Sequence, residues 1–408
     1  MDFEPSERVR NLDARLSDFM DAHVWPSDSS WTHSVEAGQY PMELIDGLKA
    51  KARELGLWNL FLPGLKDDEP GTRLSNVEYA PLAETMGRLP WASEIFNCNA
   101  PDTGNMEILH LFGTESQRKR WLEPLMTGEI RSAVAITEPD CASSDPTNLS
   151  TTIRPDGDSY VVNGRKWFTT GACHPNFAFT LAFGLTDIDL DRPRHRRHSF
   201  VIVPANARGF RVVRNIPIMN HLAPEGHCEI EFDNVVVPRD NLLGEEGAGF
   251  AVAQARLGPG RVHHCMRTIG QCERALELMC ERALSRSTFG NRLADYANIQ
   301  DWIARSRIEI DQARLLCLYA SWLMDRDGNK AARVLVSQIK VAAANLQIRV
   351  LDRAIQVWGA AGLSNDTPLA GLWTWGRALR FLDGPDEVHL RLIARNELRS
   401  VESRQGNS

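Results

Sequence analysis

The sequence contains no Cys-x-x-C pair and no Cys/His spacing typical of a zinc site, although it holds eight cysteines. We therefore expect no metal, and we interpret the cysteines as reduced thiols of a cytoplasmic protein. A net positive charge is also missing, because 53 acidic residues outweigh 46 lysines and arginines and leave a net charge of -7. Without a general attraction to phosphates, nucleic acid is not expected among the partners.

Long apolar runs are absent as well. The first residues, MDFEPSERVRNLDARL, include acidic side chains and no apolar stretch, and no later segment approaches the roughly 20 apolar residues of a membrane helix. The sequence shows no internal repeat and no low-complexity tract. We therefore expect no export signal and no membrane partner, and we predict a cytoplasmic location.

The composition that remains is that of an ordinary globular protein. With 408 residues, 43% of them hydrophobic and 24% charged, the chain can bury large cores in two or three domains. In residues 1–131 the apolar side chains recur at helical spacing, and from 132 to 243 they form short β-branched or alternating runs. From 244 to 408 helical spacing returns in long segments. The sequence thus predicts an α+β fold with an N-terminal helical domain, a small middle β-barrel or sheet domain and a C-terminal four-helix bundle.

Several local patterns refine this division. Strands are expected at 160–162, 200–203 and 230–237, and Asn163-Gly164 between two such runs predicts a hairpin turn. The basic stretch 192–198 (RPRHRRH) is interpreted as a solvated turn. In the last region helix breaks are expected at 285–290, 325–329 and 359–368. Three cysteines near heptad spacing are expected to pack in the core there: Cys265, Cys272 and Cys280.

Four motif stretches lie at the joints of these regions. They are 97–107 (NCNAPDTGNME), 137–145 (TEPDCASSD), 257–265 (LGPGRVHHC) and 383–389 (DGPDEVH). In this order, and along essentially the whole chain, they resemble the acyl-CoA dehydrogenase family, closest to the branch that contains acyl-CoA dehydrogenase family members 10 and 11. The resemblance implies an FAD-dependent oxidoreductase of fatty-acid β-oxidation, which converts an acyl-CoA thioester to the trans-2-enoyl-CoA.

The resemblance assigns flavin contacts in the middle region. It implies that Thr137 contacts the flavin and that Ser144 contacts the flavin phosphates or the pantetheine of the substrate. This loop is one residue longer than the commoner family version, so Ser143 is an alternative to Ser144. It also implies that Trp167 stacks on the isoalloxazine and that Thr169 lies near N5. Taken alone, the loop is a Ser/Asp turn and a tryptophan on a strand is more often core.

The resemblance assigns the rest of the FAD site to the C-terminal region. Arg286 and Thr288 would hold the pyrophosphate, with Phe289 packing on the cofactor, across a subunit interface. Gln356, Gly359 and Gly362 would approach the adenosine end from a neighbouring subunit, so a homodimer or homotetramer is expected. Taken alone, these segments are a polar turn and a helix end. A glutamine that many relatives use for a further cofactor contact is replaced by Ala297.

The chemistry of the implied reaction requires a base, and the resemblance points to Asp383. A base must take the α-proton while flavin N5 accepts the β-hydride. Most relatives carry Glu at this place, and taken alone Asp383 is part of an Asp-Gly turn before a helix. Phe250 and Arg261 are implied to line the acyl-CoA channel. Gly260, which matches the base position of some branches, has no side chain to act as one.

The partner of the reduced flavin is left open by the residues. The resemblance implies an electron transfer flavoprotein as acceptor. An acyl-CoA oxidase or a flavin monooxygenase on the same scaffold is the alternative, and the latter would not need a carboxylate at Asp383. A non-enzymatic scaffolding role is a further hypothesis, and a colourless purified protein would favour it. The length, branching and ring content of the acyl chain are not predicted.

Overall fold

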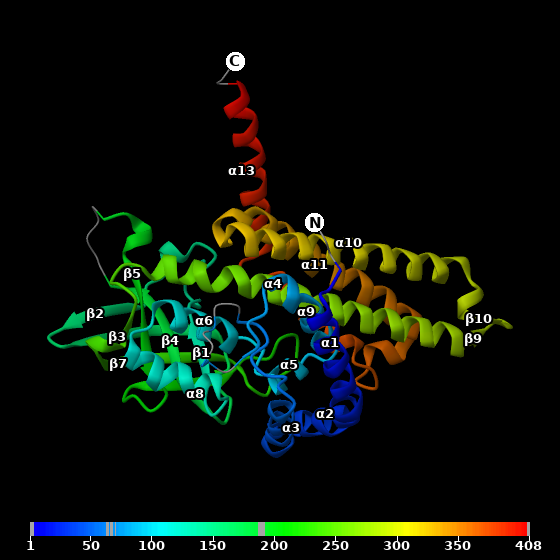
Figure 1. Ribbon diagram of the computed structural model, residues 1–408, viewed down its shortest axis with the longest axis horizontal. Helices are drawn as coiled ribbons and strands as arrows, with labels where there is room; N and C mark the ends of the chain where they lie inside the picture. Colours follow the sequence, from blue (N-terminus) through cyan, green and yellow to red (C-terminus); the bar gives the residue numbers. More distant parts are fainter. Residues whose placement is uncertain (1–3, 63–64, 66–67, 70, 187–191, 406–408) are drawn as a thin grey trace. The chain divides into compact units, whose positions relative to one another are not determined.

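The computed structural model describes residues 4–62, 65, 68–69, 71–186 and 192–405. The chain forms two compact units, each assembled from separate stretches of sequence. Unit 1 comprises Met1–Asp21, Leu74–Ser93 and Arg261–Ser408, and unit 2 comprises Ala22–Arg73 and Glu94–Gly260. Figure 1 shows the elements of both, coloured along the sequence.

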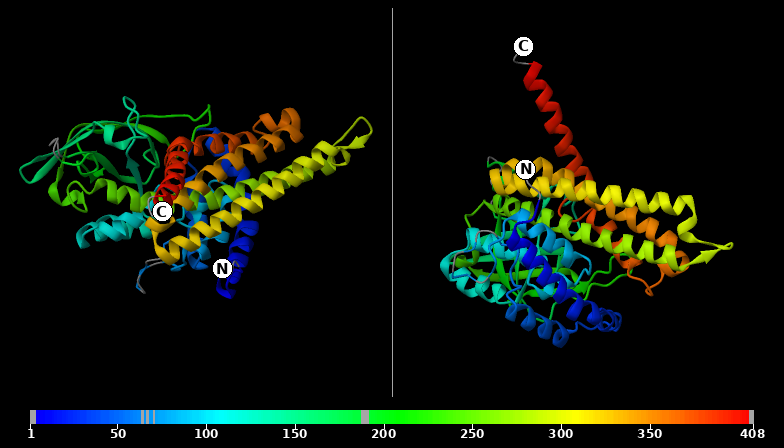
Figure 2. Two further views of the ribbon diagram at one scale, coloured as in Figure 1. Left: turned by 90° about the horizontal axis from the view of Figure 1, so that it is seen from above. Right: turned by 45° about the vertical axis from the view of Figure 1, so that its right-hand side comes forward.

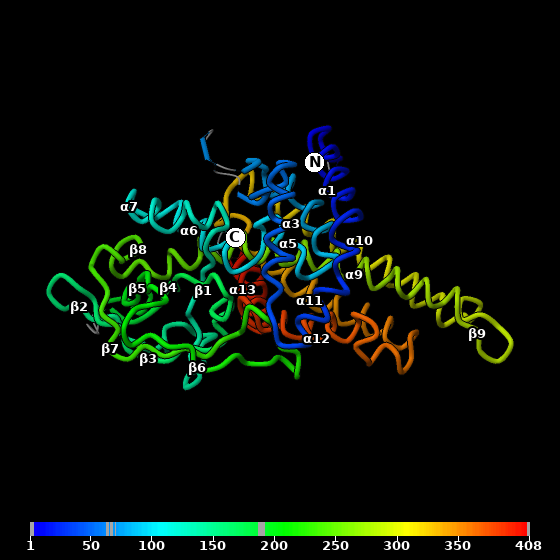
Figure 3. The backbone as a smooth tube through the Cα atoms, turned by 90° about the horizontal axis from the view of Figure 1, so that it is seen from below, coloured from blue at the N-terminus to red at the C-terminus, as the bar shows by residue number. Residues whose placement is uncertain are grey.

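Unit 1 is built from long helices. These are α1 (Glu7–Phe19), α4 (Asn76–Gly87), most of α9 (Gly249–Ser285), α10 (Ala297–Asp327), α11 (Asn329–Trp358), α12 (Leu369–Leu379) and α13 (Asp386–Gln405). Figures 1 and 2 show α9, α10 and α11 side by side, with α13 extending away from them. A hairpin of β9 (Ser287–Thr288) and β10 (Asn291–Arg292) joins α9 to α10, and Figure 3 shows it at the far tip of the pair.

The helix breaks expected in the last region are confirmed, and glycines in left-handed backbone account for two of them. Gly328, with a φ of 82°, separates α10 from α11. Gly359, with a φ of 67°, ends α11 and begins the short 3-10 turn Gly359–Leu363. These conformations are open to glycine and costly for residues with a β-carbon. Cys265 and Cys272 are buried, as predicted, and Cys280 is partly buried.

Helices α4 and α9 approach one another closely through glycines. A β-carbon on Gly87 would lie 2.3 Å from the carbonyl oxygen of Arg267, and one on Gly270 would lie 2.0 Å from that of Glu84. The pair is tied to α10 by Arg314, which forms an ion pair with Glu84 at 2.8 Å and a second one with Glu273. The backbone contact therefore fixes how α4 lies on α9.

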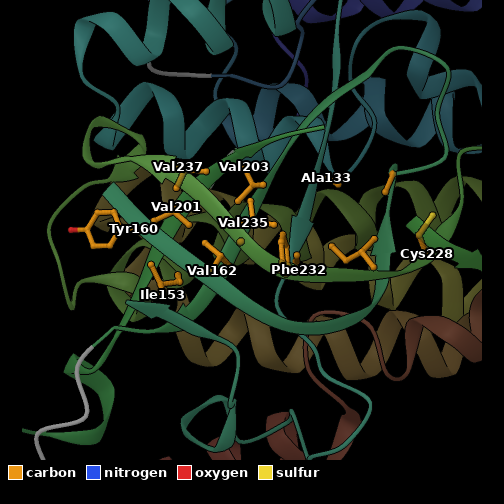
Figure 4. Close-up of a cluster of buried hydrophobic side chains, with 14 residues drawn as sticks. Ala133, Ile153, Tyr160, Val162, Val201, Val203, Cys228, Phe232, Val235 and Val237 are labelled. Carbon is orange, nitrogen blue, oxygen red and sulfur yellow. The ribbon is translucent and has the colours of Figure 1, made fainter. Parts of the chain in front are cut away.

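Unit 2 contains a mixed sheet. Its strands are β1 (Arg131–Ala135), β2 (Thr152–Asp156), β3 (Ser159–Thr170), β4 (Phe177–Leu185), β5 (His198–Pro204), β6 (Phe210–Asn215), β7 (His227–Pro238) and β8 (Leu242–Leu243). The order across the sheet is β6-β7-β3-β2-β4-β5-β8, and β1 pairs parallel to β4. Figure 4 shows its hydrophobic core, where alternate residues such as Val162, Val201 and Phe232 turn inward.

The predicted hairpin at Asn163-Gly164 is wrong. Strand β3 runs through both residues, and the turn lies earlier, between β2 and β3, at Gly157 with a φ of 53°. At Asn163-Gly164 the pairing with β7 shifts register instead. The Asn163 side chain accepts a hydrogen bond from the backbone N–H of Asn234 at 2.8 Å, and a β-carbon on Gly164 would lie 2.3 Å from the Thr151 hydroxyl oxygen. The same two residue types thus form a bulge rather than a turn.

The helices of unit 2 are shorter. They are α2 (Asp28–Glu36), α3 (Met42–Glu54), α6 (Asp102–Phe112), α7 (Glu115–Gln117) and α8 (Glu123–Met126); α5 (Ala92–Ile95) spans the boundary between the units. A buried ionic network joins them to the sheet: Lys49 pairs with Glu94 at 2.9 Å, and Arg131 pairs with Asp102 at 2.7 Å.

The basic stretch 192–198 is exposed over residues 192–196, as expected for a solvated turn, while His198 is buried in β5.

One segment is more apolar than the sequence analysis anticipated. Asn329–Leu363, which contains α11, is long and apolar enough by length and composition to cross a membrane. More than half of its apolar window is buried inside the protein, as in the core helix of a globular fold. Among the described residues no cluster of His, Cys, Asp and Glu could hold a metal ion.

Candidate functional site

Asp383 occupies a strained turn between α12 and α13. It has a φ of 53°, in the left-handed region that Asp tolerates better than most residues, and Gly384 follows with a φ of 103°. The turn is closed by a hydrogen bond from the Asp386 N–H to the Arg380 carbonyl at 3.1 Å. The Asp383 side chain is 19% exposed, so its carboxylate is neither buried nor fully solvated.

Two side chains hold the backbone carbonyl of Asp383. Arg261 donates to it from Nε at 2.8 Å, and His389 approaches it with Nε2 at 3.3 Å. The other ring nitrogen of His389 lies 3.0 Å from the Ser337 hydroxyl. Burial, reinforced by Arg261 and Lys340, lowers the pKa of His389 to about 4, so the ring is neutral at pH 7. A neutral ring that donates from Nε2 accepts at Nδ1, which matches both contacts.

The carboxylate of Asp383 faces α9. Nε2 of His264 lies 3.5 Å from Oδ2 of Asp383, and Nδ1 of His264 lies 3.2 Å from a guanidinium nitrogen of Arg267. Because a guanidinium can only donate, Nδ1 accepts and the ring proton is left on Nε2, toward the carboxylate. Sequence reasoning missed His264 and Arg267. They follow Arg261 in successive steps of three residues, which places neighbouring members of the series close together on the helix surface and could have found them.

The loop after β1 holds Thr137 and the two candidate serines. Thr137 donates to the carbonyl of Trp167 at 2.7 Å, so it is tied to the other predicted flavin segment. The hydroxyl of Ser143 lies within hydrogen-bond distance of the Glu138 backbone, 2.9 Å from its N–H, whereas Ser144 is exposed. Of the two serines, Ser144 therefore presents its side chain to solvent.

Glu138 anchors this loop to the sheet. Its carboxylate accepts hydrogen bonds from Lys166 at 2.9 Å and from the backbone N–H groups of Ser150 and Thr151 at 2.8 Å. Burial favours the neutral acid, but the Lys166 charge and these bonds outweigh it and lower the pKa of Glu138 to about 2. The carboxylate is therefore ionised and structural at neutral pH.

The predicted flavin-stacking segment lies at the end of β3. Trp167 is partly buried, and the neighbouring Phe168 is 40% exposed in left-handed backbone with a φ of 49°. Thr169 is fully buried, and its hydroxyl oxygen has no hydrogen-bond partner within the described residues. A buried hydroxyl without a partner is costly, so this atom fits a bond to a group that the chain alone does not supply. Phe168, which the sequence analysis did not name, is the most exposed residue of this segment.

Phe250 and Arg261, the predicted lining of the acyl-CoA channel, have different surroundings. Phe250 begins α9 and packs edge-on against Phe183 at 5.5 Å and His198 at 5.6 Å between ring centroids. The Nε–H group of Arg261 donates its hydrogen bond to the Asp383 carbonyl. Phe250 belongs to unit 2 and Arg261 to unit 1, and each is positioned by its own unit.

The remaining FAD candidates gather at one end of unit 1. Arg286 and Phe289 stand on the β9–β10 hairpin, where Arg286 is exposed and Phe289 is 95% exposed. Thr288 is partly buried and accepts a hydrogen bond at its carbonyl from the Tyr296 hydroxyl at 2.8 Å. A phenyl ring exposed to this degree has a large unsatisfied apolar surface, which fits packing on another molecule.

The end of α11 packs against the last turns of α9, before this hairpin. Trp358 donates to the carbonyl of Leu278 on α9 at 2.9 Å, and the Arg282 guanidinium stands over its ring at 4.9 Å. Gln356 and Gly359 are exposed. Gly362 is buried, and a β-carbon there would lie 2.8 Å from the Ile355 carbonyl oxygen, so local packing already requires this glycine.

Comparison with known proteins identifies the chain. Models of the N-terminal, middle and C-terminal domains of acyl-CoA dehydrogenase match residues 6–129, 133–235 and 247–398. A protein of Mycobacterium tuberculosis named probable acyl-CoA dehydrogenase FadE2 is 53% identical over 98% of this chain and 97% of its own length. The chain belongs to the acyl-CoA dehydrogenase family. It is an oxidoreductase of a family that depends on FAD, and its fold has the helical, β-sheet and helical domains of that family.

Two further relatives agree with this assignment. Acyl-CoA dehydrogenase family member 10 of Mus musculus is 49% identical over 97% of this chain, which spans only 37% of the mouse protein. A solved structure from Mycobacterium abscessus, provisionally assigned as an acyl-CoA dehydrogenase, is 49% identical with a TM-score of 0.92 and covers 98% of this chain and 100% of its own. The branch expected from the motif stretches is thus confirmed.

Proposed function

We propose that this acyl-CoA dehydrogenase converts an acyl-CoA thioester to the trans-2-enoyl-CoA, with Asp383 as the base that removes the α-proton. The observation that carries the proposal is the Asp383 turn: the carboxylate is partly exposed, the backbone is strained, and the side chains of Arg261 and His389 contact the Asp383 carbonyl. Strain of this kind costs about 1–3 kcal/mol and persists where the surroundings over-determine it, often at functional sites. A helix cap alone would not need such support.

The residues around Asp383 orient the base rather than take part in the proton transfer. His264 lies 3.5 Å from Oδ2 and so limits the rotation of the carboxylate, while Arg261 and His389 hold the backbone below it. A fixed carboxylate can meet the α-carbon of a bound thioester with little loss of rotational freedom. Bound FAD supplies the acceptor for the β-hydride, at N5 of the flavin.

Each unit contains residues that the family resemblance assigns to the cofactor. In unit 2 we assign the flavin to Thr137, Trp167 and Thr169, and the buried hydroxyl of Thr169 supports this. Ser144, rather than the internally bonded Ser143, would reach the flavin phosphates or the pantetheine. In unit 1 the assigned residues are Arg286, Thr288, Phe289, Gln356, Gly359 and Gly362. Phe250 and Arg261 would line the acyl-CoA channel.

The length of α9 supports a site completed by a second subunit. Between His264 beside Asp383 and Ser285 before the hairpin, α9 rises roughly 30 Å at about 1.5 Å per residue. One extended FAD does not bridge the base and the Arg286 hairpin of the same subunit over that length. We therefore propose a homodimer or homotetramer in which each FAD receives its pyrophosphate and adenosine contacts from a neighbour.

The electron acceptor and the location are proposals of the same kind. An electron transfer flavoprotein would reoxidise the flavin, and the reaction would serve fatty-acid β-oxidation. A cytoplasmic location is supported by the eight cysteines, which are all free thiols.

The proposal is tested by assaying the holoenzyme with CoA thioesters that differ in length, branching and ring content, using an artificial electron acceptor. We expect at least one thioester to bleach the flavin anaerobically and to yield an enoyl-CoA lighter by two hydrogens. Stoichiometric hydrogen peroxide in air would instead show an oxidase, and an oxygenated product a monooxygenase. If no thioester bleaches the flavin, the proposed reaction is wrong.

A further inference from the structure

Two cysteines that the dehydrogenation does not use lie in contact in unit 2. The sulfur of Cys173, in the turn after β3, is 3.2 Å from the sulfur of Cys228, the second residue of strand β7. This is well within hydrogen-bond distance for sulfur. A disulfide bond is about 2.05 Å long, so joining the two sulfurs requires a further approach of little more than 1 Å.

The backbone of both segments holds the cysteines opposite each other. The N–H of Gly171 donates to the Gly226 carbonyl at 3.0 Å, and the N–H of Cys173 donates to the Glu225 carbonyl at 2.9 Å. Gly226 has a φ of 84°, and a β-carbon there would lie 2.5 Å from the sulfur of Cys228. Only a residue without a side chain leaves room for the two thiols to meet.

The two thiols differ in exposure and in acidity. Cys173 is exposed, whereas Cys228 is 0% exposed. The hydrogen bond from the Cys228 thiol lowers the pKa of Cys173 to about 7, and the same contact, with burial, raises the pKa of Cys228. Near neutral pH, a substantial fraction of Cys173 is therefore a solvent-exposed thiolate, whereas the buried Cys228 remains a protonated thiol.

We propose that Cys173 and Cys228 form an oxidation site for hydroperoxides, in which Cys173 is the attacking thiolate and Cys228 the resolving thiol. The Cys173 sulfur attacks the peroxide oxygen, the O–O bond breaks, and Cys173 becomes a sulfenic acid while water or an alcohol leaves. The Cys228 sulfur then attacks the Cys173 sulfur, the S–OH bond breaks and water leaves. In sum, two thiols give up two protons and two electrons, and one hydroperoxide is reduced.

The site lies next to a predicted flavin segment. Cys228 pairs with Thr169 across the β3–β7 ladder, and His227 pairs with Thr170, whose hydroxyl lies 2.9 Å from Nδ1 of His227. A disulfide would therefore fix the turn that follows Thr169 and Thr170 to the start of β7. The proposal does not depend on Asp383 or on the proposed reaction, because it concerns only these thiols.

The experiment is peptide mapping of the holoenzyme after exposure to stoichiometric hydrogen peroxide at pH 7. We expect an intact mass lower by two hydrogens, a Cys173–Cys228 cross-linked peptide, and full reversal by dithiothreitol. C228S should instead accumulate a sulfenic acid at Cys173 that dimedone captures. C141S is the matched control, since Cys141 is a partly exposed thiol that contacts Glu138 and Ser143, and it should still form the cross-link.

A second readout needs no oxidant. The rate of Cys173 alkylation by iodoacetamide should be half-maximal near pH 7, because the thiolate forms as pH rises through its pKa. In C228A, which removes the hydrogen-bond donor, this midpoint should move up toward that of an ordinary thiol, roughly pH 8.5. The proposal is overturned if peroxide leaves the parent protein without the Cys173–Cys228 peptide, or if the midpoint is the same in C228A.

Discussion

His264 is the residue whose side chain contacts the carboxylate of the proposed base. Its Nε2 proton faces the Asp383 carboxylate because Arg267 occupies the other nitrogen. His264→Leu should slow anaerobic flavin reduction by about tenfold, since a hydrogen bond to a charged group is typically worth about 1.5–3 kcal/mol and this contact is long. His264→Gln, which keeps a donor, should recover part of the rate. Both variants should retain FAD, and an unchanged rate in His264→Leu would show that His264 does not orient the base.

Arg286 offers a second test at this scale. It is exposed on the β9–β10 hairpin, where the proposed assembly would bring it to the FAD pyrophosphate. Arg286→Ala should raise the dissociation constant of FAD by about 10–100-fold, and Arg286→Lys should lie between, because lysine keeps the charge but loses the bidentate fork. The measurement is flavin retained after ultrafiltration. Equal retention by the alanine variant and the parent would place the pyrophosphate elsewhere.

How far the site could be predicted differs from residue to residue. The resemblance pointed to Asp383 and Arg261, and the structure brings them into contact within unit 1. His264, Arg267 and His389 lie within quoted motif stretches or one helical turn beyond them, but nothing in the sequence says which carboxylate a histidine faces. That information is in the left-handed turn at Asp383, which depends on tertiary contacts. The assigned roles of the flavin and substrate residues stay predictions.

At the scale of elements, the contact of α4 with α9 carries a stability prediction. A β-carbon at Gly270 would collide with the Glu84 carbonyl, and backbone cannot yield as a flexible side chain does. Gly270→Ala should therefore lower the free energy of unfolding by roughly 1–3 kcal/mol or more, typical of overpacking.

Gly371→Ala is the matched control for this test. Gly371 lies within α12, and a β-carbon there would meet nothing within 4 Å. Alanine should be neutral or stabilise by up to about 1 kcal/mol, because it reduces the entropy of the unfolded chain. Urea unfolding of the holoproteins followed by circular dichroism measures both. The packing account fails if Gly270→Ala is as stable as Gly371→Ala.

Helices and strands were predictable where local sequence features, such as glycines and β-branched runs, mark their ends or their type. The ends of α10 and α11 follow from glycines that leave the helical conformation, and the β-branched runs became β3, β5 and β7. The hairpin prediction at Asn163-Gly164 was wrong because a dipeptide does not show which residues of the neighbouring strand β7 lie opposite it. There Asn163 bonds to Asn234, and a register shift replaces the turn. Nor could periodicity show that α1 and α4 fold with the last region of the chain rather than with α3.

At the scale of the whole molecule, the exposed apolar residues of unit 1 bear on assembly. Phe289 is 95% exposed and Leu363 is 73% exposed, and further apolar side chains are exposed along α10 and α13, namely Ile308, Leu315, Leu390 and Leu398. Surfaces of this kind commonly mark protein interfaces. The holoenzyme should be a dimer or tetramer by light scattering, and dilution to monomers should release FAD. A monomer that retains FAD tightly would contradict the shared site.

Asp383 is the proposed base that takes the α-proton. Asp383→Asn is nearly isosteric and removes only the capacity to accept a proton, so fold, FAD content and thioester binding should be close to those of the parent. The deciding measurement is the rate of flavin reduction by the true substrate in anaerobic stopped flow. General-base catalysis typically contributes about 10²–10⁴-fold, so we predict a loss of that order. Reduction of the Asp383→Asn flavin at the parent rate would show that Asp383 is not the base and is only part of a turn.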